Sequence, residues 1–159
     1  VPSENEEVSS EAKDSQLTME KYDIPLQGHS VAVVINGNIS EDTLKAYAET
    51  FIENKLNYAF VGQHPKKISE DFGITETYNT AHPTLFDSLI VLSDGTDINP
   101  NAEAFAELNY KHGKPLVVNS AVAKGLSDAK INLEAPGVFI SDKPQVIIQA
   151  FKKVRYWDR

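Results

Sequence analysis

Short apolar runs alternate along this chain with segments of helical periodicity, and this alternation constrains the fold more than any other feature of the sequence. Five runs of three to five residues are almost entirely apolar, at residues 31–35, 58–61, 89–92, 116–118 and 138–140. A continuous apolar run of this length is typical of a strand that is buried on both faces of a sheet. Helical segments separate most of the runs, so successive strands are expected to be parallel and joined by right-handed crossovers. The sequence therefore predicts a doubly wound α/β fold, with helices on both faces of a mostly parallel sheet.

Three amphipathic helices are expected, after the first, third and fifth runs. The first begins at the N-cap residue Ser40 and the second at Asn99, where Pro100 occupies the first helical position. The last begins near Asp142 and Pro144. The side chains expected to face the core are Leu44, Tyr47, Ala48, Phe51 and Ile52 in the first helix, Ala102, Phe105, Ala106 and Leu108 in the second, and Val146, Ile147, Ala150, Phe151 and Val154 in the last.

Three further segments complete the expected topology. Residues 71–78 fit a small hairpin or a strand pair over the edge of the sheet, and residues 82–86 fit one helical turn. A short helix is expected at residues 121–126, with Gly125 near its end. Gly113 follows the second long helix in the position where glycine commonly ends a helix.

The net charge of −8 is concentrated at the start of the sequence. Residues 1–27 hold seven acids and two lysines, which account for −5 of that charge. They are polar and lack strong periodicity, so we expect an acidic flexible linker there and a folded domain at residues 28–159. An acidic chain without a basic patch is a poor partner for nucleic acid or an anionic membrane surface. The start also lacks the pattern of a signal peptide, which slightly favours the cytoplasm and leaves secretion open.

The turn that follows the fourth run has the build of an active-site turn. A buried strand at 116–118 leads through Asn119 and Ser120 into a short helix, and α/β enzymes often present a nucleophile on such a strand-to-helix turn. The chain has no cysteine, which excludes disulfides, thiolate metal sites and a cysteine nucleophile. The remaining candidate nucleophile in this turn is Ser120.

Ser120 would need a general base within hydrogen-bonding distance. Of the four histidines, only His64 follows a strand, and it alone is expected at the same rim of the sheet as Ser120. His29 and His82 precede strands and His112 ends a helix, so these three are expected at the opposite rim. We therefore favour Ser120 as the N-cap of the short helix over Ser120 as a nucleophile.

The other polar motifs are weak signals of chemistry. Asp94 and Asp97 could act as an acid–base pair or bind a cation, although an Asp-Gly-Thr-Asp segment between a strand and a helix is more often a turn. The glycines do not have phosphate-loop spacing, and the histidines lack zinc-ligand spacing. Residues 38–40 match a glycosylation sequon. At the end of the chain, Tyr156 and Trp157 fit either a cover for the last helix or an interface anchor.

Several segments resemble the C-terminal domain of large-subunit haem catalases, over about residues 28–159. The similar segments are the first strand with its Asn36-Gly37 turn and residues 85–92, 104–115, 136–138 and 154–159. The last of these, Val-Arg-Tyr-Trp-Asp-Arg, is the most specific, because large catalases end in a similar run with a histidine where Val154 stands. That domain is similar to the PfpI-type branch of the class I glutamine amidotransferases. The resemblance implies a flavodoxin-like three-layer α/β/α sandwich with a mostly parallel sheet of five to six strands.

The resemblance also gives expectations about chemistry. In the hydrolytic relatives, the fourth strand leads into a Cys-His elbow, with an acid after the first strand. Aligned by this strand, Asn119 stands at the cysteine position and Ser120 at the histidine position, so the elbow is expected to be vestigial and the chain to hold no catalytic, cofactor-binding or metal-binding residue. The haem of the parent catalase is expected in its core domain, which this chain does not contain, and none of the six tyrosines is expected to bind it.

The function implied is therefore that of a non-catalytic accessory domain of a catalase, which decomposes hydrogen peroxide. The expected partner is the protein's own catalase core in a homotetramer, where the domain would stabilise the assembly or shape the path of substrate. Two alternatives stay open: a holding chaperone for unfolded client proteins, since the superfamily includes such proteins, and a residual hydrolase or glyoxalase-like enzyme, which the missing cysteine disfavours.

Overall fold

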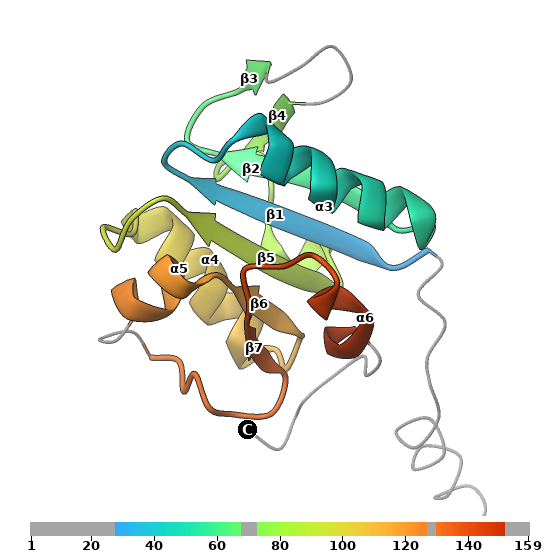
Figure 1. Ribbon diagram of the computed structural model, residues 1–159. Helices are drawn as coiled ribbons and strands as arrows, with labels where there is room; N and C mark the ends of the chain where they lie inside the picture. Colours follow the sequence, from blue (N-terminus) through green and yellow to red (C-terminus); the bar gives the residue numbers. More distant parts are fainter. Residues whose placement is uncertain (1–27, 68–72, 127–129, 152–159) are drawn as a thin grey trace, which may run out of the picture.

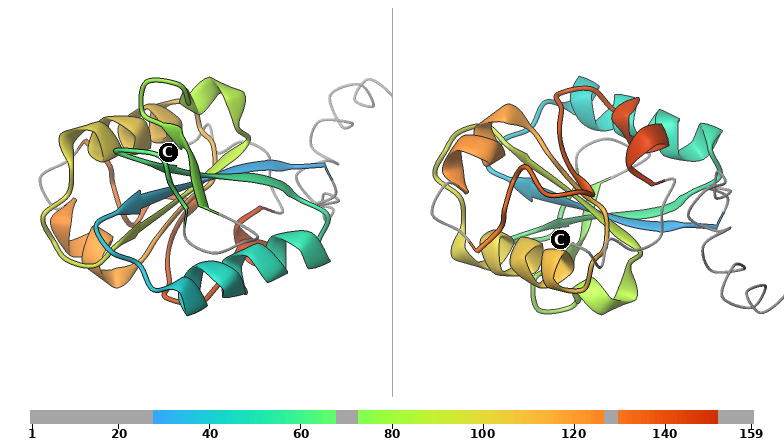
Figure 2. Two further views of the ribbon diagram at one scale, coloured as in Figure 1. Left: turned by 90° about the horizontal axis from the view of Figure 1, so that it is seen from above. Right: turned by 90° about the horizontal axis from the view of Figure 1, so that it is seen from below.

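Among the residues that the structure describes, seven strands form one central sheet, and helices pack on both of its faces (Figures 1 and 2). The computed structural model describes residues 28–67, 73–126 and 130–151. Across the sheet the order is β3-β4-β2-β1-β5-β6-β7, and every neighbouring pair is parallel except β3 and β4. The strands are β1 (Ser30–Asn36), β2 (Asn57–Gly62), β3 (Lys66–Lys67), β4 (Gly73–Thr77), β5 (Ser88–Ser93), β6 (Leu116–Val118) and β7 (Val138–Ile140).

All five predicted strands are present, and their order identifies the fold. Numbered along the chain without β3 and β4, they lie in the order 2-1-3-4-5, which is the flavodoxin-like arrangement. The expected count of five to six strands is wrong, because β4 extends the sheet beyond β2 and β3 pairs with β4 in the antiparallel sense. β4 lies within the segment predicted as a hairpin, but its partner β3 comes earlier. β3 consists of two exposed lysines, so it has no apolar run that could reveal a strand.

The helices divide between the two faces of the sheet. Side chains of α3 (Glu41–Glu53) and α6 (Val146–Ala150) join the core on one face. Side chains of α4 (Pro100–Lys111) and α5 (Ser120–Gly125) join the core on the other, and η1 (Pro83–Leu85) forms the predicted helical turn. Both faces are covered because successive apolar side chains of β1 point to opposite sides of the sheet. Val31, Val33 and Ile35 face the first core, and Ala32 and Val34 face the second. The expectation of a strand buried on both faces is confirmed.

The buried faces of the helices differ in detail from the prediction. In α3, Ile52 is 65% exposed although we expected it in the core, because it follows Phe51 by about 100° of rotation and leaves the buried stripe. In α4, Leu108 is only partly buried and Asn109 takes the core position, one turn after Phe105. Asn109 is tolerated there because its amide donates to the carbonyl of Pro115 over 3.1 Å.

The last helix begins later than predicted. α6 starts at Val146, and Asp142 lies in the loop before it, where its carboxylate accepts hydrogen bonds from another element. Ile147, Ala150 and Phe151 are buried as expected. The expected linker at 1–27, Val154 and the Tyr156–Trp157 pair lie outside the described residues. No helix within the described ranges has the length and apolar character needed to cross a bilayer.

Candidate functional site

The order of the strands reverses between β1 and β5, and the ends of these two strands form the base of the candidate site. In open α/β sheets ligands bind outside the carboxyl ends of the strands at such a reversal. The last residues of the two strands, Asn36 and Ser93, are register partners. The Asn36 amide donates to Ser93 Oγ over 2.9 Å and to the carbonyl of Asp97 over 3.0 Å, and its oxygen accepts the backbone N–H of Asn99. This one side chain therefore fixes the loop after β5 against β1.

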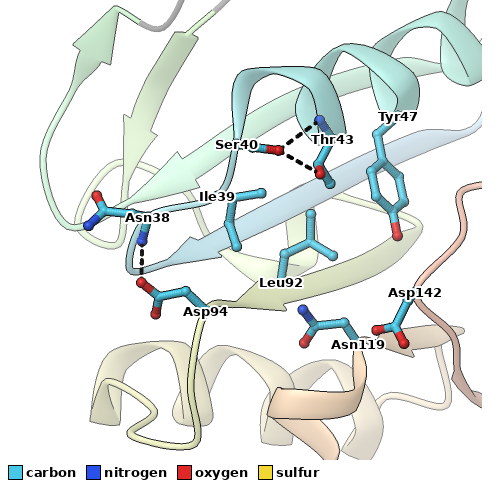
Figure 3. A pocket seen from close by; sticks show the side chains of 9 residues that line it. All are labelled: Asn38, Ile39, Ser40, Thr43, Tyr47, Leu92, Asp94, Asn119 and Asp142. Atoms are coloured by element: carbon cyan, nitrogen blue, oxygen red, sulfur yellow. Dashed lines mark hydrogen bonds between the residues drawn. The ribbon is translucent and has the colours of Figure 1, made fainter.

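A pocket of about 220 Å³ opens at this rim, as Figure 3 shows. Its wall combines the loop after β1, the first turns of α3, the end of β5, the turn between β6 and α5, and the loop before α6. The lining residues are Asn38, Ile39, Ser40, Thr43, Tyr47, Leu92, Asp94, Asn119 and Asp142. The pocket thus collects polar side chains from four loops of the carboxyl rim, as a ligand site in this fold does.

Tyr47 is the most unusual member of the lining. Its side chain is only 1% exposed, and within the described part of the chain its hydroxyl oxygen has no hydrogen-bond partner. Burial first, and then the negative charge of Asp142, raise the pKa of Tyr47 to about 12. Figure 3 shows the hydroxyl pointing toward Asp142 across the pocket. The phenol therefore keeps its proton at neutral pH, and its hydroxyl is directed toward the pocket from a position that solvent does not reach.

Asp142 is held in place by Ser120. The Ser120 backbone N–H donates to one carboxylate oxygen over 3.0 Å, and the Ser120 hydroxyl donates to the other over 2.6 Å. These bonds, the side-chain bond first, lower the pKa of the Asp142 carboxyl below its usual value. Asp142 is therefore a charged acceptor at neutral pH and a weak base toward the Ser120 hydroxyl.

The N-cap of α5 is Asn119, and the prediction that Ser120 fills this position is wrong. The Asn119 side-chain oxygen accepts the N–H of Val122 over 3.1 Å and that of Ser93 over 3.3 Å. Its amide also donates to the Ser93 carbonyl over 2.8 Å. Ser120 is the first residue of the helix instead. The cap lies one residue earlier because the asparagine side chain can bond both the helix N-terminus and the neighbouring strand.

Within the described residues no histidine makes a hydrogen bond that would activate Ser120. The His64 loop follows β2, which is three strand spacings, or about 14 Å, away from β6 across the sheet. His29 lies at the start of β1, where its ring bonds Ser88 Oγ over 2.7 Å. His82 bonds Thr84, and His112 caps the C-terminus of α4. These positions agree with the expected placement of the histidines along the strands.

Asp94 and Asp97 have separate positions in the loop after β5. The Asp94 carboxylate accepts the backbone N–H of Asn38 over 2.9 Å and occupies the space that a side chain at Gly37 would need. Asp97 contributes its backbone carbonyl to Asn36. In the ranges that the structure describes, no three His, Cys, Asp or Glu side chains come together as a metal site. Asp94 therefore stabilises the turn through its bond to Asn38, and its carboxylate also lines the pocket.

Sequence reasoning did not predict that Tyr47 and Asp142 line this pocket. Tyr47 falls on the helical apolar stripe, so its spacing marks it only as a core residue. Asp142 stands near the start of a predicted helix, where an acidic side chain is expected because it interacts favourably with the helix dipole. The available signal was the polar tip of a tyrosine in a buried stripe, because such a hydroxyl usually requires a partner.

The comparison with known proteins identifies the family of the chain. No curated protein matches the chain. A family model described as the C-terminal domain found in long catalases matches residues 27–159, which include every strand and helix of the described residues. The chain therefore belongs to the family of C-terminal domains of long catalases.

Proposed function

We propose that residues 28–159 form a non-catalytic accessory domain that packs against its own catalase core in a homotetramer and stabilises the assembly or shapes the access of substrate. The family match is the observation that carries this proposal. The haem of long catalases lies in their core domain, and we assign no cofactor to this chain.

The local geometry of the turn supports a structural role. A nucleophile at the Asn119 position would need a free reactive atom, whereas the oxygen and nitrogen of this amide bond Val122 and Ser93. The neighbouring hydroxyl of Ser120 donates to a carboxylate whose pKa is lowered, so that carboxylate is a poor base for activating it. The turn joins β5, β6 and α5 through these bonds.

Deletion of residues 28–159 from the catalase polypeptide that carries them tests the proposal. We expect the remaining core to keep its haem and its peroxide turnover per haem, and to lose tetramer stability, measured as faster loss of activity and faster dissociation on heating. A variant with unchanged heat resistance, unchanged assembly and unchanged dependence of rate on peroxide concentration would contradict it.

The 159-residue chain by itself provides the matching control. It should show no Soret absorption and no consumption of peroxide, and haem retained in stoichiometric amount would overturn the accessory role. The same sample tests the two alternatives: suppression of client aggregation at substoichiometric amounts would favour a chaperone. Ester or methylglyoxal turnover that Ser120→Ala abolishes would favour an enzyme.

A further inference from the structure

The buried hydroxyl of Tyr47 indicates that the pocket at the end of β1 and β5 is incomplete without a ligand. A hydroxyl that is buried without a hydrogen bond destabilises a fold, and such groups in native proteins usually have a partner. Tyr47 is 1% exposed, its oxygen is unpaired among the described residues, and it points into the pocket (Figure 3). A polar group bound in the pocket beside this hydroxyl would supply the partner that the described residues do not.

The charges of the lining exclude anions as that partner. Asp94 and Asp142 contribute carboxylates, and the lining contains no lysine, arginine or histidine. The other polar members, Asn38, Ser40, Thr43 and Asn119, are neutral. A phosphate or carboxylate would meet two like charges without a basic side chain, so the pocket selects a neutral or cationic molecule.

The hydrogen-bonding needs of Tyr47 and Asp142 favour a neutral ligand over a cationic one. Tyr47 keeps its proton, and its best partner accepts that proton; Asp142 is charged, and its partner must donate one. A ligand hydroxyl both accepts and donates, an ammonium group only donates, and an anion only accepts. The two bonds from Ser120 leave further lone pairs on the Asp142 carboxylate for a ligand.

The volume of the pocket and the other lining residues indicate a ligand with several hydroxyl groups. A volume of 220 Å³ equals about seven waters at their share of the liquid, so a single water does not fill it. Ile39 and Leu92 provide apolar wall for a carbon skeleton, and Asp94 provides a second acceptor. We propose that this pocket binds a small neutral polyol, with one hydroxyl between Tyr47 and Asp142, a second at Asp94, and its carbons against Ile39 and Leu92. The proposal goes beyond the accessory role and does not depend on it.

Titration of the ¹⁵N-labelled 159-residue chain with glycerol, erythritol and xylitol tests the proposal, followed by two-dimensional amide NMR. We expect saturable shifts at the amides of Asn38, Asn119 and Asp142. Tyr47→Phe should weaken binding roughly fivefold, since it removes one hydrogen bond. Tyr78→Phe is the matched control: it removes a tyrosine hydroxyl whose pKa is also raised to about 12 by burial, but which lies on the other core beside Phe105, and binding should be unchanged.

Three results would overturn the proposal. The first is the absence of saturable shifts with all three polyols, which is the outcome if bound water alone satisfies Tyr47. The second is equal affinity in the wild type and Tyr47→Phe, or in Asp142→Ala if Tyr47→Phe does not fold, because the exposed Asp142 can be truncated with little effect on packing. The third is tighter binding of inorganic phosphate or ethylammonium than of any polyol.

Discussion

Truncation of Asn119 should destabilise the domain more than truncation of its neighbour Ser120. Asn119→Ala removes the N-cap bond to Val122, which contributes about 1 kcal/mol at a typical cap. It also removes both bonds to the backbone of Ser93, a residue only 4% exposed, at a net cost of about 1 kcal/mol each. The three contributions overlap, so we expect a loss of about 2–3 kcal/mol in the free energy of unfolding, or a fall in Tm of roughly 8–12 °C for a domain of this size.

Ser120→Ala is the matched comparison, because it removes one hydroxyl in the same turn. That hydroxyl bonds the exposed carboxylate of Asp142, which water can solvate in its place, so we expect a smaller loss, below about 1 kcal/mol. Urea unfolding followed by far-ultraviolet circular dichroism measures both variants. A loss in Ser120→Ala that equals or exceeds the loss in Asn119→Ala would refute the assignment of the cap and would restore Ser120 to that position.

Three further predictions concern the rim of the pocket. Gly37→Ala should destabilise the domain by at least about 1 kcal/mol, because Gly37 has a φ of 91° and its new methyl would overlap a carboxylate; Gly95→Ala, with open space around it, should have little effect in the same unfolding assay. The pKa of Asp142 should rise toward 3.8 in Ser120→Ala, which removes the hydroxyl bond and keeps the backbone N–H bond, measured by carboxyl ¹³C NMR; an unchanged pKa would contradict the bond from the Ser120 hydroxyl. The pKa of Tyr47 is raised from its ordinary value of 10.0 to about 12 in the folded domain. The buried neutral phenol therefore contributes fully to the free energy of unfolding below pH 10, and this contribution is lost as the pH rises toward 12. Urea unfolding in this range should show a weaker pH dependence in Tyr47→Phe, and an equal dependence would contradict its burial.

The sheet was predictable from the sequence because burial on both faces leaves a direct mark on the side chains. The five apolar runs became β1, β2, β5, β6 and β7, and their helical connections determined that these strands are parallel. The starts of the first two long helices were equally readable, since Ser40 and Asn99 cap α3 and α4 through their own side chains. These features depend on interactions over a few residues.

The edge of the sheet and the limits of the buried faces were not predictable in this way. β3 is a strand only because β4 lies beside it, and its exposed lysines carry no signal of that neighbour. Ile52 satisfies the helical period and is nevertheless exposed, because the width of the buried stripe depends on where the partner elements end. The pairing of an edge strand and the exposure of a helical side chain therefore depend on how the sheet and helices pack together.

The candidate site, too, combines features that the sequence predicts with features that depend on the fold. The sequence by itself determined that the turn after β6 has the build of an elbow and that no thiol occupies it. Only the tertiary structure decided that Asn119 caps the helix, that Ser120 bonds Asp142, and that the hydroxyl of Tyr47 points at this carboxylate. The physical reason is that these contacts join residues far apart in the chain, and their distances are set by the packing of α3, β6 and the loop before α6. A local pattern identifies a residue as cap, core or turn, and its partners follow from the fold.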